Sequence, residues 1–219
     1  MDNEIFGYKF SNPELFKIAL THPSTKGEEN YQKFEFLGDR VLGLTMAEYV
    51  FRKFPNEAEG DLAKRQVVLV CGDTLAKIGA EQGIGDKLIM SLGEEQTEGR
   101  INPSNLEDAM EAIIAAIYLD CNDYKIISNV LLDLWGERLS AFKEPPQDPK
   151  SKLQEYFQAN NIALPEYRVV SQIGADHEPV FTMELSVEGF ESISIEAKSK
   201  KKGERELAEL MLKQLGNKI

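Results

Sequence analysis

The sequence has few cysteines and no long apolar run. Its 219 residues include two cysteines, Cys71 and Cys121, and no Cys-x-x-Cys pair, which excludes a disulfide framework and predicts two free thiols in a reducing cytosol. The N-terminal segment carries Asp2 and Glu4 and lacks a basic flank followed by an apolar core, so it is not a secretory signal. The longest strongly apolar stretch, Ile113–Leu119, is far shorter than the roughly 20 residues of a membrane-spanning helix. We therefore expect a cytoplasmic protein that does not bind a membrane.

Basic residues are also scarce. The 25 lysines and arginines are outnumbered by 37 aspartates and glutamates, which gives a formal net charge of -12. This balance does not favour a simple basic nucleic-acid binder. It favours either a solubilising acidic surface or carboxylates gathered around a cation. The apolar fraction of 42% and the charged fraction of 28% predict a packed core rather than extensive disorder.

The hydrophobic pattern of residues 1–144 has the period of helices almost throughout. Residues 83–100 are rich in glycine and polar side chains and are expected to form a loop. Asn102 and Pro103 suit the N-cap and the first position of a helix. The expected helices cover residues 34–54, 61–81, about 103 onward and about 125–142. The apolar face of the first comprises Phe34, Leu37, Val41, Leu44, Ala47 and Tyr49.

A proline-rich linker is expected at residues 145–149, because Pro145, Pro146 and Pro149 make a stiff, extended connector. Beyond it, β-rich segments alternate with turn residues. The order is α-β-β-β-α, with a helix at about 150–160, strands at 167–173, 179–187 and 191–197, and a helix at 201–215. The expected fold class is therefore multi-domain: an all-α domain at 1–144 followed by an α+β domain at 150–219.

Two carboxylates lie at helical spacing inside an apolar run. Glu35 and Asp39 are four residues apart and so share one helical face, where like charges repel. A bare carboxylate beside apolar side chains is unfavourable. Gly38, within the same helix, lowers helix stability by about 1 kcal/mol relative to alanine. A glycine is therefore expected there only if a neighbouring segment must approach closely. The pattern therefore indicates a special environment on this helix.

A second pair repeats this arrangement. Asp108 and Glu111 are three residues apart, beside the apolar stripe of the helix that starts near Pro103. The two pairs could pool four negative charges, and oxygen ligands favour a hard cation such as Mg²⁺ or Mn²⁺. A di-iron bundle would need Glu-x-x-His motifs, and neither Glu35 nor Glu111 is followed by one. Either pair alone is also compatible with a solvated acidic face.

Four motifs, in order, resemble the ribonuclease III family. They read Ala-Leu-Thr-His-Pro-Ser at 19–24, Phe-Glu-Phe-Leu-Gly-Asp at 34–39 followed by Val-Leu at 41–42, Glu-Gly-Asp-Leu at 59–62, and Leu-Glu-Asp-Ala-Met-Glu-Ala at 106–112. Residues 150–219 look like a double-stranded-RNA-binding domain, so the resemblance covers the whole chain. It implies an all-helical endonuclease domain at 1–144 that forms a homodimer with one active site in each subunit.

The resemblance also implies roles for individual residues. The family's metal-binding carboxylates are matched by Glu35, Asp39, Asp108 and Glu111. Asp39 and Glu111 are the implied catalytic residues, Glu59 matches an outer acidic position, and Phe36 matches an aromatic residue at the dimer interface. The implied cofactor is Mg²⁺, for which Mn²⁺ can substitute.

The reaction implied is hydrolysis of double-stranded RNA to 5′-phosphate and 3′-hydroxyl ends, in the processing of ribosomal and other RNA. Two ions about 4 Å apart can activate water and stabilise the leaving oxygen. Duplex RNA is recognised through its shape, 2′-hydroxyls and phosphates. The residues that match the family's RNA contacts are Gln154 and Glu155 on the first helix of the second domain, His177 in the loop between its first two strands, and Ser199, Lys200 and Lys201 at the start of its last helix.

The sequence departs from the family's pattern at three places. Gln32 stands where the family usually has glutamate, residues 195–197 replace a Gly-x-Gly, and Gly203 replaces an alanine. The first change removes one outer charge, and the other two could weaken the loop or the last helix. Two alternatives to an active nuclease therefore stay open: an RNA-binding protein with an inactive nuclease domain, and a dimeric scaffold with a non-catalytic metal site.

Overall fold

The computed structural model of the chain describes residues 3–27, 29–140, 145, 147–174 and 179–216. It divides into two compact units, residues 1–146 and 147–219. The division falls inside the segment at 145–149 that the sequence predicts to be a linker. Pro149, the last residue of that segment, is the first residue of a helix whose N-cap is Asp148.

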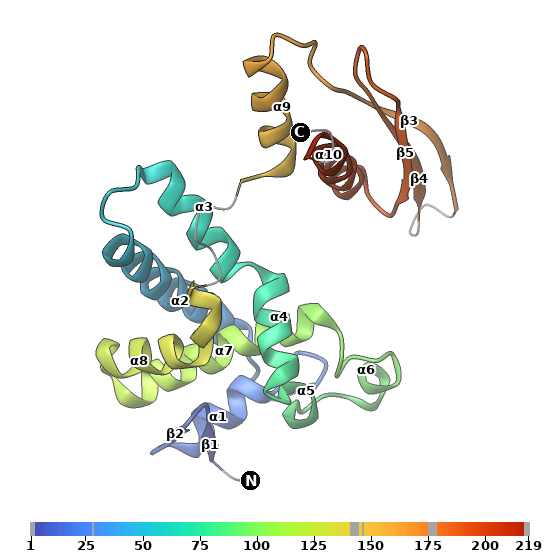
Figure 1. The fold of residues 1–219 in the computed structure, drawn as a ribbon. Helices are drawn as coiled ribbons and strands as arrows, with labels where there is room; N and C mark the ends of the chain where they lie inside the picture. The colour runs from blue at the N-terminus through green and yellow to red at the C-terminus, as the bar shows by residue number, and fades with distance from the viewer. Residues whose placement is uncertain (1–2, 28, 141–144, 146, 175–178, 217–219) are drawn as a thin grey trace. The chain divides into compact units, whose positions relative to one another are not determined.

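The first unit is a set of helices with one small hairpin at its N-terminus (Figure 1). The hairpin, β1 (Glu4–Ile5) and β2 (Tyr8–Lys9), was not predicted. The helices are α1 (Pro13–Leu20), α2 (Gln32–Lys53), α3 (Glu59–Val70), α4 (Gly72–Glu81), α5 (Ile84–Lys87), α6 (Leu92–Gln96), α7 (Pro103–Cys121) and α8 (Tyr124–Trp135), followed by a 3-10 helix, η1 (Gly136–Ser140).

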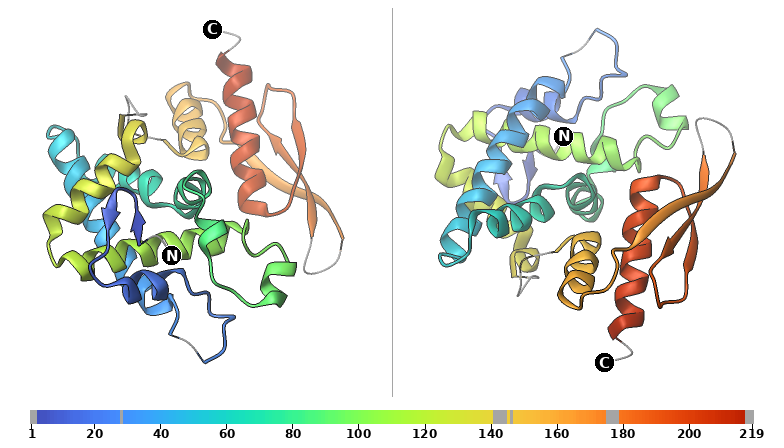
Figure 2. Two further views of the ribbon diagram at one scale, coloured as in Figure 1. Left: turned by 90° about the horizontal axis from the view of Figure 1, so that it is seen from below. Right: turned by 90° about the horizontal axis from the view of Figure 1, so that it is seen from above.

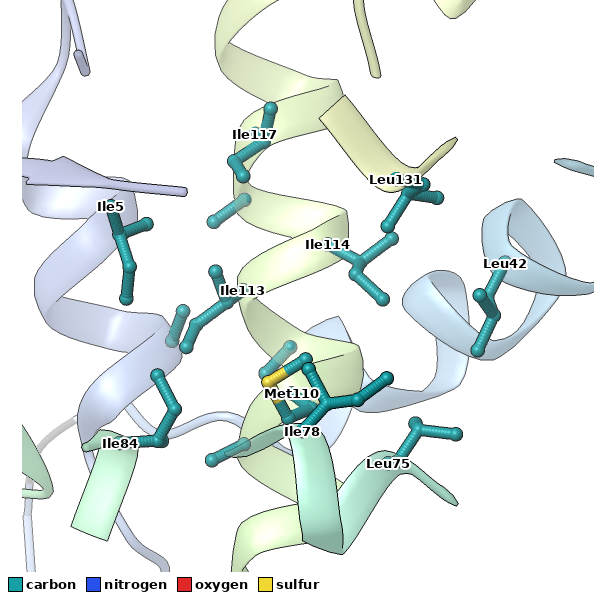
Figure 3. Close-up of a cluster of buried hydrophobic side chains, with 14 of the residues drawn as sticks. Ile5, Leu42, Leu75, Ile78, Ile84, Met110, Ile113, Ile114, Ile117 and Leu131 are labelled. Carbon is teal, nitrogen blue, oxygen red and sulfur yellow. The ribbon is translucent and has the colours of Figure 1, made fainter. Parts of the chain in front are cut away.

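Helix α7 forms the centre of this unit. Every side chain from Ala112 to Ile117 is fully buried, and α7 packs against α1, α2, α4 and α8, as the views in Figures 1 and 2 agree. A helix that is apolar on all sides must be surrounded by other elements. Figure 3 shows its isoleucines among side chains from several of them, and the labelled residues are Ile5, Leu42, Leu75, Ile78, Ile84, Met110, Ile113, Ile114, Ile117 and Leu131.

The single helix predicted at 61–81 is wrong, because the chain breaks into α3 and α4 at Cys71. Cys71 has an extended conformation, with φ -70° and ψ 151°. The last carbonyl groups of α3 find other partners: the Thr74 hydroxyl donates to the Val68 oxygen at 2.8 Å, and the Trp135 indole donates to the Leu69 oxygen at 2.9 Å. One local and one long-range hydrogen bond thus satisfy carbonyl groups at the end of a helix that the hydrophobic pattern would continue.

Two further boundaries differ from the prediction. The segment 83–100 is not a plain loop, since it contains the short helices α5 and α6. The helix predicted at 125–142 ends at Trp135, because Gly136 has a positive φ of 46° that terminates it. The predicted start of α7 is confirmed: the Asn102 side chain accepts a hydrogen bond from the Ser104 N–H at 3.0 Å.

The second unit has the predicted α-β-β-β-α order. Its elements are α9 (Pro149–Ala159), β3 (Glu166–Ile173), β4 (Val180–Ser186), β5 (Ile193–Ala197) and α10 (Lys200–Gly216). The strands form an antiparallel sheet in the order β3-β4-β5, and both helices lie on one face of it (Figure 1). The core between helices and sheet includes Phe157, Met183, Leu185, Leu207 and Met211. Across the described residues of both units, no helix has the length and apolarity needed to span a membrane.

Candidate active site and RNA-binding surface

The backbones of α2 and α7 come into direct contact at Gly38. A Cβ atom on Gly38 would lie 1.8 Å from the carbonyl oxygen of Glu111, which no side chain can occupy. The close approach anticipated from this mid-helix glycine is therefore confirmed. It brings the α2 turn that carries Glu35 and Asp39 against the α7 turn that carries Asp108 and Glu111.

The charges of these carboxylates act on one another. Burial raises the pKa of Glu111 to about 8, and the nearby charges of Asp39, Glu107, Glu35 and Asp108 add to the effect. Burial also raises the pKa of Glu35, again with contributions from the carboxylates of both helices. Neighbouring negative charges and loss of water both disfavour the ionised form. The structure thus gathers the four predicted residues into one acidic region at the α2–α7 contact, named here the acidic centre: Glu35, Asp39, Asp108 and Glu111.

The carboxylates of the acidic centre are not arranged as a closed cage. Within the part of the chain that the structure describes, no three His, Cys, Asp or Glu side chains are grouped closely enough to hold a metal ion. Asp39 forms an ion pair with Arg40, and Asp108 accepts a hydrogen bond from the Tyr31 hydroxyl at 3.4 Å. The four carboxylates thus lie near one another and their charges repel. Two of them, Asp39 and Asp108, have partners within the protein.

Glu107 also belongs to this region, although the spacing of the two acidic pairs does not single it out. Burial raises its pKa, and Asp108 and Asp73 contribute. A Cβ on Gly72 would lie 2.3 Å from the Glu107 Oε2 atom, so the glycine leaves room for the carboxylate at the start of α4. The signal was present in the sequence, because Glu107 directly precedes Asp108 and lies four residues before Glu111.

The outer acidic residue Glu59 lies elsewhere in this unit. It is the exposed first residue of α3 and lines a groove of about 600 Å³ between α2 and α3, together with Leu44 and Phe51. It is not among the charges that shift the pKa of Glu35 or Glu111. In a single copy of the chain, Glu59 thus lines this groove and takes no part in the charge interactions that raise the pKa of these two carboxylates.

Apolar side chains are exposed along α2 and α3. Phe36 is 65% exposed and Phe51 is 70% exposed. Leu44, which the sequence pattern placed on the apolar face of α2, is 57% exposed, so that part of the prediction is wrong. Val67 on α3 is also exposed. Large apolar side chains exposed on neighbouring helices are typical of a protein–protein interface.

Several basic residues of the second unit are clustered at the start of α10. Ser199, Lys200 and Lys201 are exposed, and the Ser199 hydroxyl accepts the N–H of Lys202 at 3.3 Å, as at a helix N-cap. Gly203 is buried: a Cβ there would lie 2.4 Å from the sulfur of Met183. The methionine thus takes the space that the family's usual alanine would need.

The structure describes two of the three remaining predicted RNA contacts. On α9, Gln154 is half-buried and Glu155 is exposed. His177 lies outside the described residues. Because Ile193–Ala197 form β5, which pairs with β4, the departure from Gly-x-Gly at 195–197 is part of a regular strand.

Comparison with known proteins decides the family. Residues 12–132 match the family described as Ribonuclease-III-like, and residues 149–215 match the double-stranded RNA binding motif. The chain belongs to the ribonuclease III family. It is 40% identical over 220 residues to Ribonuclease 3 of Wolbachia sp. subsp. Drosophila simulans (strain wRi), covering 98% of this chain and 94% of that protein. It is also 40% identical over 216 residues to Ribonuclease 3 of Ehrlichia canis, covering 97% and 95%.

A solved structure matches the first unit. The nuclease domain of a ribonuclease III from Campylobacter jejuni aligns with a TM-score of 0.59 and 41% identity. That structure is described as showing flexibility in a region involved in dimer formation. The alignment covers 63% of this chain and 94% of that one. The predicted family and fold class are thus confirmed, and this ribonuclease III is an endoribonuclease that acts on double-stranded RNA.

Proposed function

We propose that the chain hydrolyses double-stranded RNA with Mg²⁺ bound at the acidic centre, leaving 5′-phosphate and 3′-hydroxyl ends. The observation that carries the proposal is the α2–α7 contact at Gly38, which gathers four carboxylates whose charges oppose one another. All four are hard oxygen donors of the type that Mg²⁺ and Mn²⁺ prefer. A divalent cation would relieve their repulsion, so the donor set fits the metal.

Glu35, Asp39, Asp108 and Glu111 would hold the metal, and Asp39 would exchange its ion pair with Arg40 to do so. When bound, the ions lower the pKa of a water molecule and stabilise charge on the leaving oxygen. The residues of the chain place these charges and exclude bulk water on the α7 side, where the neighbouring residues are fully buried. Asp39 and Glu111 are the catalytic residues in this account.

The proposal is tested by incubating the full-length protein with a long RNA duplex in Mg²⁺, in Mn²⁺ or in EDTA, and identifying the ends of the products. We expect cleavage with either metal and none in EDTA, with 5′-phosphate and 3′-hydroxyl ends. Duplex binding without cleavage in every condition would favour the inactive RNA-binding alternative. A role in ribosomal RNA processing and a cytoplasmic location stay predictions, as does the division into domains at 1–144 and 150–219 with a linker at 145–149.

We also propose that the exposed apolar side chains of α2 and α3 pair two copies of the chain. The related nuclease domain has a region involved in dimer formation, and Phe36 lies beside the acidic centre, one residue after Glu35. Pairing through this surface would bring the Glu59 of each copy into the interface, since it lines the same groove as Phe51.

Replacing Phe36 with aspartate is therefore expected to convert the dimer to a monomer, because a buried unpaired charge at an interface costs several kcal/mol. Sedimentation velocity on the purified protein measures the change. Leu92→Asp is the matched control, because Leu92 on α6 is 76% exposed and lies away from this surface. A dimer that survives Phe36→Asp, or dissociates equally with Leu92→Asp, would contradict the assignment.

We propose that duplex RNA binds the second unit through α9 and the start of α10. Replacing both Lys200 and Lys201 with alanine should weaken duplex binding about 10-fold or more at moderate salt and lower the slope of log affinity against log salt by roughly 1–2. Binding is measured by fluorescence anisotropy in Ca²⁺ at several salt concentrations. Lys213→Ala, an exposed lysine near the other end of α10, should leave both quantities unchanged. Equal effects of the two variants would refute a local contact.

A further inference from the structure

Tyr31 joins the two helices of the acidic centre. Its side chain is 1% exposed, and its backbone N–H donates to the Thr21 oxygen at 3.0 Å. Its carbonyl oxygen accepts the N–H of Glu35 at 2.8 Å, while its hydroxyl donates to Oδ2 of Asp108 at 3.4 Å. One residue therefore fixes the start of the helix that carries Glu35 and also contacts a carboxylate on α7.

The Tyr31 hydroxyl is the only hydrogen-bond donor that Asp108 has among the residues described by the structure. Burial raises the pKa of Asp108, and the hydrogen bond from Tyr31 opposes that effect by stabilising the carboxylate. The bond engages one carboxylate oxygen, Oδ2. The other oxygen is left for a further partner.

The ring of Tyr31 is held in place by a chain of polar side chains. The His22 ring packs edge-on against it, with centroids 5.6 Å apart. Nδ1 of His22 accepts the Ser24 N–H at 3.0 Å, so the neutral ring carries its hydrogen on Nε2, which lies 3.3 Å from Oδ1 of Asn105. The amide of Asn105 in turn donates to Glu94 at 2.9 Å. These contacts hold the His22 ring against the Tyr31 ring, which is buried with its hydroxyl beside Asp108.

We infer that Tyr31 is a positioning residue for metal binding: its hydroxyl orients the Asp108 carboxylate towards the cation, and the chain from His22 through Asn105 to Glu94 fixes the Tyr31 ring. The inference rests on the proposed function, because it takes Asp108 as a metal ligand. Outer hydrogen bonds of this kind orient ligands in metal sites, and their loss lowers metal affinity about 10- to 100-fold.

The test is Tyr31→Phe in the full-length protein, which keeps the ring and removes only the hydroxyl. Mn²⁺ binding is measured without RNA by the electron paramagnetic resonance signal of free Mn²⁺, and cleavage is measured across Mn²⁺ concentrations. We expect about 10-fold weaker Mn²⁺ binding, an equal shift in the Mn²⁺ concentration for half-maximal cleavage, and recovery of most of the rate at saturating Mn²⁺, because every ligand is still present.

Tyr8→Phe is the matched control, since it removes a tyrosine–aspartate hydrogen bond of 2.7 Å to Asp120 in the same unit. It should leave Mn²⁺ binding unchanged. Parental Mn²⁺ affinity in Tyr31→Phe would overturn the inference. A melting temperature of Tyr31→Phe far below that of Tyr8→Phe would also overturn it, because the Tyr31 hydroxyl would then act mainly in stabilising the fold. Asp108→Asn distinguishes failure of this inference from failure of the proposed function. If Asp108→Asn also binds Mn²⁺ with the parental affinity, Asp108 is not a metal ligand and the proposed metal site itself fails.

Discussion

Replacing Glu111 with glutamine is expected to abolish cleavage of a long RNA duplex while leaving duplex binding intact. Glu111 is the most strongly perturbed acid of the acidic centre, next to the charges of both helices. Losing one metal ligand should remove several kcal/mol of transition-state stabilisation, which corresponds to a rate reduction on the order of 10³-fold or more. Single-turnover cleavage in Mg²⁺ and duplex binding in Ca²⁺ measure the two effects separately.

Loss of folding does not account for this expected defect. The charged form of Glu111 is disfavoured in the folded protein, because its pKa is raised from 4.5 to about 8. The protonated form of Glu111 therefore contributes fully to the stability of the folded protein below about pH 4.5. This contribution is lost as the pH rises towards about 8 and the carboxyl group ionises. At pH 7 without metal, the glutamine protein should melt no lower than the parent. Asp133→Asn, on the exposed side of α8, is the charge control and should cleave normally. Parental cleavage by Glu111→Gln would remove the residue from the mechanism.

Replacing Gly38 with alanine is expected to destabilise the nuclease unit severely and to stop cleavage. The added Cβ would lie 1.8 Å from a backbone oxygen of α7, and backbone cannot move aside as a flexible side chain can. The two helices must separate, at a cost of about 3 kcal/mol or more. That loss would lower the melting temperature by roughly 6–12 °C in a chain of this size. Differential scanning calorimetry in EDTA measures it without interference from metal binding.

Gly43→Ala provides the matched control on the same helix. The nearest atom to a Cβ at Gly43 is 3.9 Å away, so the alanine fits, and its better helix propensity should stabilise α2 by up to about 1 kcal/mol. The two substitutions therefore change stability in opposite directions. Equal melting temperatures for the two variants would show that the α2–α7 contact is not as close as described.

The acidic centre was predictable because its signals are local. Glu35 and Asp39 share a helical face by spacing alone, and Gly38 between them is unfavourable unless another backbone comes close. The structure supplies that backbone at Glu111. The buried stripe of α7 was predictable for a similar reason, since its apolar residues run from Ala112 to Ile117 without interruption.

The features that sequence reasoning missed depend on contacts between distant segments. No proline near Cys71 forbids a helix, and one of the two hydrogen bonds that satisfy the end of α3 comes from Trp135, which is 64 residues later. Leu44 has the spacing of a core residue but lies on a face that a single chain leaves exposed. Tyr31 carries no motif of its own, and only the fold places its hydroxyl next to Asp108.

Anomalous diffraction from a crystal of the protein soaked in Mn²⁺ tests the central claim most directly. The account predicts anomalous peaks between α2 and α7, with oxygens of Glu35, Asp39, Asp108 and Glu111 at about 2.0–2.3 Å from the ions. Strong peaks elsewhere on the molecule, with these four side chains directed apart into solvent, would contradict it.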